Sequence, residues 1–149
     1  MAMATRPRTG GGLRPSFDQT FLAMAEILAE QSTCPDGARH GAIITIDRRV
    51  VATGYGSPSS GAEPCERCWL REKFEATGIK DWSVCPSVHA ELNALLFAAR
   101  FGISVLGGTV YVTKAPCDPC RRALSNAGIA RVVALGATPF SLTFSGKAT

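Results

Sequence analysis

The chain has 149 residues, 46% of them hydrophobic and 19% charged, so it is long enough for one domain with a sizeable core. No apolar run reaches the length of a membrane-spanning helix, because Arg100, Lys114 and Arg131 interrupt the hydrophobic stretches, and we expect no membrane association. The formal net charge of +4 is mild, and three of the positive charges lie within the first 15 residues, so the rest of the fold is close to neutral, which suits a small anionic substrate better than a nucleic-acid duplex.

The chain is expected to comprise a flexible N-terminal arm, residues 1–15, and a single domain, residues 16–149. The arm is rich in glycine and carries Arg6, Arg8 and Arg14, but it has no apolar signal core. Three arginines without interleaved aromatic residues favour a solvated tail over a nucleic-acid-binding one. Without a secretion signal, the six cysteines are expected to hold metal rather than form disulfides, which predicts a cytoplasmic protein.

The first part of the domain predicts one helix followed by two strands. Ser16 can cap a helix that runs to about Gln31. Residues 41–47 are predicted to form a buried strand, and a tight turn at Arg48-Arg49 leads into a second strand over 50–55. The stretch 54–64, rich in Gly, Ser and Pro, predicts a loop.

The second part alternates strands and helices after a charged, cysteine-rich insert over 64–86. The insert is predicted to hold a short helix over 69–77. Gly102 ends a helix predicted over 88–101, and Gly128 ends one over 117–127. Strands are predicted over 109–113 and 129–135, with an edge strand at 142–144. This alternation indicates an α/β domain whose sheet is covered on both faces.

The strongest chemical signal joins His89-Ala90-Glu91 with the later Pro-Cys-x-x-Cys motif at 116–120. His89, Cys117 and Cys120 supply one imidazole and two thiolates, ligands that zinc prefers, and leave a fourth coordination position for water. A Cys-x-x-Cys motif alone also occurs in redox and structural sites. Both half-motifs in this order are far more specific than either one, so we predict a catalytic zinc site.

Both half-motifs are predicted to lie at helix N-termini. Cys117 and Cys120 are three residues apart, so they share one face of a first helical turn. Ser87 is a plausible cap for the helix that carries His89. Because helix N-termini carry partial positive charge, they are expected to favour thiolates over thiols.

These motifs resemble the cytidine deaminase superfamily and, within it, the deoxycytidylate (dCMP) deaminases. The similar stretches lie within about residues 17–135 and include GAIITIDRRVVATGYG, CERCWLRE and CPSVHAELNALLFAARFGISVLGGTVYVTKAPCDPC. The resemblance implies a cytidine deaminase-like fold, a three-layer α/β/α sandwich around a five-stranded mixed sheet. It also implies a homo-oligomer, either a dimer or a hexamer.

The resemblance implies a hydrolase that acts on the C4 amino group of a cytosine nucleotide, converting dCMP to dUMP and ammonia. Bound Zn²⁺ lowers the pKa of water so that hydroxide attacks C4 of the base. Glu91 is the expected catalytic residue: it takes the proton from the water, protonates the ring nitrogen, and then protonates the departing amine. The alternative for Glu91 is a solvated glutamate in a first helical turn.

Three residues are predicted to bind substrate. Asn93 contacts the base or the sugar by resemblance, and its alternative is a helix surface amide. Ser57 and Ser59 follow a strand in a Gly/Pro loop and present hydroxyls and amides to a phosphate, although an ordinary surface turn is an equal alternative. This loop lacks an asparagine that dCMP deaminases typically have, and His40 stands where a valine often precedes Gly-Ala.

The remaining cysteines, Cys34, Cys65, Cys68 and Cys85, predict a second, structural zinc. Cys65 and Cys68 have the spacing of a zinc knuckle. Some dCMP deaminases hold a structural zinc with cysteines from equivalent places. Four thiolates would pin the insert against the first helix. The alternative is that some of these cysteines are buried thiols.

Other functions remain open on the sequence alone. The substrate alternatives are CMP, dCTP and a modified, for example 5-methylated, cytosine nucleotide. A nucleic-acid base deaminase should show a basic surface rich in aromatic residues. The chain has only two tryptophans and two tyrosines, which argues against this function. A non-catalytic zinc-binding module has no need of the proton carrier that Glu91 provides.

Overall fold

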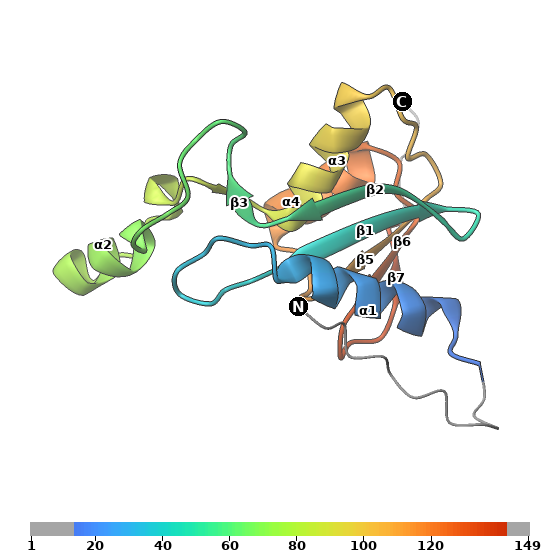
Figure 1. The fold of residues 1–149 in the computed structure, drawn as a ribbon, viewed down its shortest axis with the longest axis horizontal. Coiled ribbons are helices and arrows are strands. Elements are labelled where there is room, and N and C mark those ends of the chain that lie inside the picture. Colours follow the sequence, from blue (N-terminus) through green and yellow to red (C-terminus); the bar gives the residue numbers. More distant parts are fainter. Residues whose placement is uncertain (1–13, 143–149) are drawn as a thin grey trace, which may run out of the picture.

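A computed structural model describes residues 14–142, and most of the predicted N-terminal arm lies outside these residues (Figure 1). The helices are α1 (Phe17–Ala29), α2 (Trp69–Thr77), α3 (Ala90–Arg100) and α4 (Asp118–Asn126), with a 3₁₀ turn, η1 (Trp82–Val84). The strands are β1 (Gly41–Ile46), β2 (Arg49–Tyr55), β3 (Ser57–Pro58), β4 (Ser87–Val88), β5 (Thr109–Val112), β6 (Arg131–Ala134) and β7 (Phe140–Ser141).

The predicted three-layer sandwich around a five-stranded mixed sheet is confirmed. The strands lie in the order β2-β1-β5-β6-β7, and β5 and β6 form the parallel pair. Helix α1 covers one face, and α3 and α4 cover the other (Figure 1). Residues of β1 alternate between the two layers: Ile43 packs with α1, whereas Ala42 and Ile44 pack in the cluster that includes α3.

Helix α1 begins where the sequence predicts. The Ser16 hydroxyl accepts the amide proton of Gln19, and the Gln19 side chain accepts the amide proton of Ser16 in return. Asp18 in the first turn forms a bidentate ion pair with Arg131 of β6 and accepts a hydrogen bond from the Tyr111 hydroxyl. These contacts fasten the start of the helix to the sheet.

Two sequence predictions about turns and strands are corrected. The β1–β2 turn is at Asp47 and Arg48, which adopt φ of 48° and 61°, and Arg49 already belongs to β2. Aspartate tolerates this left-handed region better than most residues do. The predicted edge strand exists as β7, which ends before the predicted start at 142, and residues 143 and 144 lie outside the described part of the chain.

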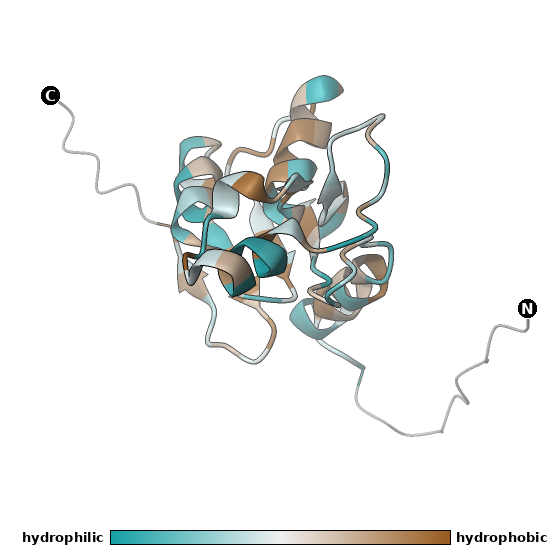
Figure 2. Ribbon diagram, turned by 90° about the vertical axis from the view of Figure 1, so that its left-hand side faces the viewer, coloured by the Kyte–Doolittle hydropathy of each residue, from teal (hydrophilic) through white to brown (hydrophobic). Residues whose placement is uncertain are grey.

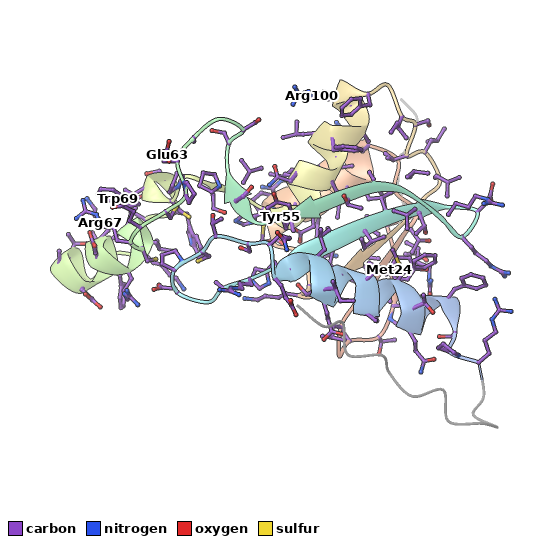
Figure 3. All side chains as sticks on the ribbon, viewed as in Figure 1. Met24, Tyr55, Glu63, Arg67, Trp69 and Arg100 are labelled. Carbon is purple, nitrogen blue, oxygen red and sulfur yellow. The ribbon has the colours of Figure 1, made fainter. Side chains whose placement is uncertain are left out.

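Strands β3 and β4 form a separate two-stranded ribbon that the sequence does not predict. The ribbon leads into the cysteine-rich insert, whose helix α2 projects away from the sheet (Figure 1). Arg67 lies 3.7 Å from the ring centroid of Trp69, and both side chains belong to this projecting part (Figure 3). Among residues 14–142, no helix combines the length and apolar character needed to cross a membrane.

Gly54 allows α3 to pack directly against β2. A Cβ atom at this position would lie 2.2 Å from the carbonyl oxygen of Ala90 and 2.4 Å from the amide nitrogen of Ala94. Both obstructing atoms belong to the backbone of α3, so neither moves without displacing the helix. Since this helix carries the second half of the His-x-Glu motif, the close contact helps to place the site.

We expect Gly54→Ala to lower the free energy of unfolding by about 3 kcal/mol or more, at the upper end of typical overpacking costs. Urea denaturation measures this change. Gly56→Ala is the matched control, because a Cβ there lies 3.5 Å from the Ser32 hydroxyl, an ordinary contact. Equal stability losses in the two variants would contradict the close-packing argument.

Candidate active site

The residues of the two half-motifs meet at the N-terminal ends of α3 and α4, as predicted. His89 is the N-cap residue of α3, and Cys117 is the N-cap residue of α4. The prediction that Ser87 caps α3 is wrong, because Ser87 belongs to β4 and pairs with Pro58. Pro119 is accommodated in the first turn of α4, where an amide proton has no intrahelical partner.

The three proposed ligand atoms are close enough to share one zinc ion. The Nδ1 atom of His89 lies 3.5 Å from the Cys117 sulfur and 3.4 Å from the Cys120 sulfur. Zinc bonds of about 2.3 Å to sulfur and about 2.0 Å to nitrogen, at a tetrahedral angle, place the two ligand atoms about 3.6 Å apart. The donor set and its spacing therefore fit zinc. His89 and Cys117 are exposed, which leaves one side of the site open.

Glu91 lies beside this cluster in the first turn of α3. It is only 7% exposed, and its carboxyl group contacts Cys120. Burial raises its pKa above the ordinary glutamate value, although its own backbone amide, His89 and Cys120 act in the opposite direction. A carboxyl group whose pKa is raised toward neutrality is suited to both accepting and donating a proton. The alternative of a solvated surface glutamate does not fit this burial.

The helix N-terminus alone does not turn Cys120 into a thiolate. Its side chain is fully buried, and burial, together with the charge of Glu91 and the neighbouring Cys117, raises the pKa of its thiol. The sequence prediction that partial positive charge at the helix start favours the thiolate is outweighed by this desolvation. Ionisation of Cys120 therefore requires a stronger positive charge, such as a metal ion.

Asn93 and Ser57 are brought together, whereas Ser59 lies in the following exposed turn. The Asn93 Nδ2 atom is within hydrogen-bonding distance of the Tyr55 carbonyl (2.7 Å), the Val88 carbonyl (3.2 Å) and the Ser57 hydroxyl (3.4 Å). Its amide protons therefore join α3 to β2 and to the β3–β4 ribbon. Within residues 14–142 the Asn93 carbonyl oxygen makes no side-chain hydrogen bond.

Three further residues, His40, Thr113 and Lys114, border this end of the sheet. The sequence analysis gave Thr113 and Lys114 no role in the site. The Thr113 hydroxyl lies 3.5 Å from the Nδ1 atom of His40 and accepts the amide proton of Gly41 at 3.2 Å. Burial lowers the pKa of His40, and the positive charges of Lys114 and His89 lower it further. No sequence signal joins positions 40 and 113, because their contact depends on the pairing of β1 with β5.

The four remaining cysteines line one small cavity of about 30 Å³. The charges of Cys85 and Cys34 both act on Cys65, so the sulfurs are near neighbours, and all six cysteines of the chain are free thiols. The grouping is looser than at His89, since no three of these sulfurs lie within 4.8 Å of one another. Asp36 contacts Cys68 and pairs with Arg71, so the loop after α1 holds the start of α2.

A polar cavity of about 420 Å³ lies at the opposite end of the sheet. The start of α1, the β1–β2 turn and Arg131 line it, and it contains none of the predicted site residues. The His/Cys/Cys cluster and Glu91 lie instead at the end of the sheet where α3 and α4 begin.

Comparisons with known proteins agree with this geometry. The family model described as "Cytidine and deoxycytidylate deaminase zinc-binding region" matches residues 15–136. The chain is 40% identical over 124 residues to the deoxycytidylate deaminase of Mycobacterium phage D29, in an alignment covering 80% of this chain and 94% of the relative. It is 34% identical over 145 residues to the deoxycytidylate deaminase of Enterobacteria phage T4, covering 76% and 75% of the two chains.

A solved structure shares the fold. The crystal structure of dCMP deaminase from the cyanophage S-TIM5, in complex with dCMP and dUMP, superposes with a TM-score of 0.67. The two sequences are 24% identical, and the match covers 83% of each chain. At this identity the superposition establishes the common fold.

Proposed function

Because the chain belongs to the cytidine and deoxycytidylate deaminase family, we propose that it catalyses the zinc-dependent hydrolytic deamination of a cytosine nucleotide, dCMP, to dUMP and ammonia. The relatives that are 32–40% identical and named deoxycytidylate deaminase support this choice of substrate. The enzyme is a hydrolase acting on the C4 amino group.

The observation that carries the proposal is the buried carboxyl group of Glu91 beside a His/Cys/Cys cluster that is open on one side. A structural zinc site is closed by four protein ligands and uses no proton carrier. Here three ligands leave a coordination position for water, and a carboxyl group with a raised pKa stands next to it. This combination favours hydrolysis over a purely structural role.

Each of the site residues has a distinct role in the proposed reaction. His89, Cys117 and Cys120 would hold the zinc ion, which when bound supplies the Lewis acidity that makes water nucleophilic at neutral pH. Glu91 accepts one proton of the attacking water and passes it to the ring nitrogen next to C4. It then takes the second proton, from the new hydroxyl group at C4 as the carbonyl forms, and delivers it to the leaving amine, which departs as ammonia. Asn93 offers its carbonyl oxygen to the base or sugar, and Ser57 and Ser59 border the same side.

An ammonia-release screen of the zinc-loaded protein tests the function. The substrates are dCMP, CMP, dCTP, deoxycytidine and 5-methyl-dCMP, with a single-stranded DNA oligonucleotide as the nucleic-acid arm. We expect kcat/KM to be highest for dCMP. Release from the oligonucleotide alone would indicate a base deaminase of nucleic acid, and release from none of them would indicate a zinc-binding module without this activity.

We further propose that Cys34, Cys65, Cys68 and Cys85 bind a second, structural zinc. Their common cavity and the Asp36–Arg71 ion pair of 2.5 Å support this, since both join the insert to the loop after α1. Residues 16–149 then form one domain in which the insert 64–86 is fixed by metal. Six free thiols suit the cytoplasm, where cysteines stay reduced.

Purified protein is expected to contain two zinc ions per chain. Cys65→Ser combined with Cys68→Ser should retain one zinc and lose stability, because structural zinc contributes on the order of ten kcal/mol in small metal-dependent folds. Elemental analysis and thermal melting measure both changes. One zinc ion in the unaltered protein, with no change on double substitution, would remove the second site.

We also propose that the chain forms a homo-oligomer through the outer face of α3. Leu96, Phe97 and Phe101 are 58%, 43% and 62% exposed, and the two phenylalanine rings contact each other at a tilt of 47°, with centroids 4.8 Å apart. Figure 2 shows α3, the helix that rises at the top, as mostly hydrophobic. Exposed apolar surface of this kind marks interaction sites, and a symmetric pair of chains would cover both copies at once.

Light scattering at micromolar concentration is expected to give a mass of at least two chains. Leu96→Glu should shift the mass toward one chain, because it places a charge within the apolar face. Ile27→Glu is the matched control, since Ile27 is 67% exposed on α1, across the sheet from α3. A mass of one chain for the unaltered protein would contradict the proposed assembly.

A further inference from the structure

A small group of polar side chains, one of them a lysine, borders the candidate active site and is not used by the proton-transfer chemistry. His40 stands directly before β1, and Thr113 and Lys114 directly follow β5. Lys114 is only three residues before the proposed ligand Cys117. The Thr113 hydroxyl lies 3.5 Å from the Nδ1 atom of His40, and Lys114 is the next residue, so these three residues share one region of the molecule.

The backbone around His40 is firmly held. The Gly56 amide donates to the His40 carbonyl at 3.0 Å, and the buried Ser32 hydroxyl donates to the Gly56 carbonyl at 2.7 Å. Tyr55, just before Gly56, marks the end of β2 at this edge of the sheet (Figure 3). A side chain carried on a backbone held in this way has less freedom to lose when a ligand binds, which lowers the entropic cost of recognition.

The hydrogen bonds around Thr113 indicate that the Nε2 atom of His40 is a donor. Because the Thr113 hydroxyl accepts the Gly41 amide proton, its own hydrogen is available for the Nδ1 atom of His40. The proton of the neutral ring then belongs on Nε2, which makes no hydrogen bond within residues 14–142. An N–H group on a half-buried ring in the same region as an exposed lysine is a combination that receives an anionic oxygen.

The positive charge of Lys114 is not neutralised locally. The ion pairs within residues 14–142 join Arg67, Arg71 and Arg131 to acidic partners, and none of them includes Lys114. The side chain is exposed, so it is free to follow a ligand. An unpaired lysine beside a half-buried histidine donor matches a phosphate group, which lysine binds as a point charge.

We propose that Lys114 and His40 bind the 5′-phosphate of the cytosine nucleotide and thereby select nucleotides over nucleosides. This inference rests on the proposed deaminase function, because it assigns the phosphate end of the same substrate site. It places phosphate recognition on the β1 and β5 ends of the sheet, rather than on the Ser57–Ser59 loop.

Substitution of Lys114 separates phosphate recognition from catalysis. Lys114→Gln is expected to lower kcat/KM for dCMP by roughly 10- to 100-fold, the range for losing a hydrogen bond to a charged group. The value for deoxycytidine should stay within about twofold, since that substrate has no phosphate. Lys73→Gln is the matched control, because Lys73 is an exposed lysine on α2 in the projecting insert. It should change neither value.

Two further variants sharpen the assignment. His40→Gln keeps a side-chain donor and should retain more of the preference for dCMP over deoxycytidine than His40→Val does. Because Ser57 borders the substrate, Ser57→Ala should change kcat/KM for dCMP and for deoxycytidine by the same factor, and so leave the ratio of the two values unchanged. If Ser57→Ala abolishes the preference while Lys114→Gln preserves it, the phosphate site belongs to the loop and the proposal is overturned.

A binding measurement keeps this inference distinct from the proposed function. Titration calorimetry with dUMP and deoxyuridine reports phosphate recognition without turnover. We expect dUMP to bind the zinc-loaded protein more tightly than deoxyuridine, and Lys114→Gln to remove that difference. If no cytosine compound releases ammonia, the deaminase function fails while this titration still decides the phosphate site. Equal affinities for dUMP and deoxyuridine in the unaltered protein would overturn it.

Discussion

Glu91→Gln is expected to abolish nearly all turnover while leaving the fold and the zinc content intact. An amide has almost the same shape as the carboxyl group but does not exchange protons with water or with the base. Loss of a general acid–base typically lowers the rate by about 10²–10⁴-fold, and here one residue serves several proton transfers, so we expect at least this loss. Steady-state ammonia release from dCMP measures it.

The same variant should be no less stable than the unaltered protein. Glu91 is buried and its pKa is raised by that burial, so its ionised form is disfavoured in the folded chain at neutral pH. A neutral glutamine avoids this cost. Glu26→Gln, on the exposed face of α1, is the matched control and should change neither rate nor stability. Near-normal deamination by Glu91→Gln would show that the mechanism is wrong even if zinc is bound.

The parts of the fold that depend on local sequence signals are those that could be predicted. Ser16 with Gln19 sets the start of α1, and Gly102 and Gly128, with φ of 65° and 84°, follow the ends of α3 and α4. The start of α4 at Cys117 agrees with Pro119 in its first turn, whereas α3 begins after His89 and not after the predicted cap Ser87. The core of the site was accessible from the sequence because the His-x-Glu and Pro-Cys-x-x-Cys motifs identify its residues directly.

Features that depend on distant pairing escaped prediction. The β3–β4 ribbon pairs Ser57 with Val88. Each of its two strands is only two residues long, which is too short for a recognisable alternation of apolar and polar residues. Because Ser87 belongs to this ribbon, the N-cap residue of α3 is His89 and not Ser87 as predicted. In the same way, His40 meets Thr113 only because β1 and β5 are neighbours, although 73 positions separate them. Burial of Glu91 and Cys120, which sets the directions of their pKa shifts, is likewise a property of the packed structure.

Removing one zinc ligand should affect stability in opposite directions with and without metal. Cys117 occupies the N-cap position of α4, yet its side chain makes no capping hydrogen bond. Serine is among the preferred N-cap residues and contributes typically about 1 kcal/mol relative to alanine. In metal-free protein, Cys117→Ser should therefore be at least as stable as the unaltered chain, and more stable than Cys117→Ala.

With zinc present the order should reverse. The unaltered protein gains the binding energy of three ligands, whereas both variants lack one thiolate and should lose the catalytic ion and with it deamination. Melting temperatures with zinc and with a chelator, together with zinc content, separate the two effects. Because serine restores the helix cap but not the metal site, Cys117→Ser distinguishes a ligand from a residue that merely starts a helix. A variant that keeps its zinc and its activity would show that Cys117 is not a ligand.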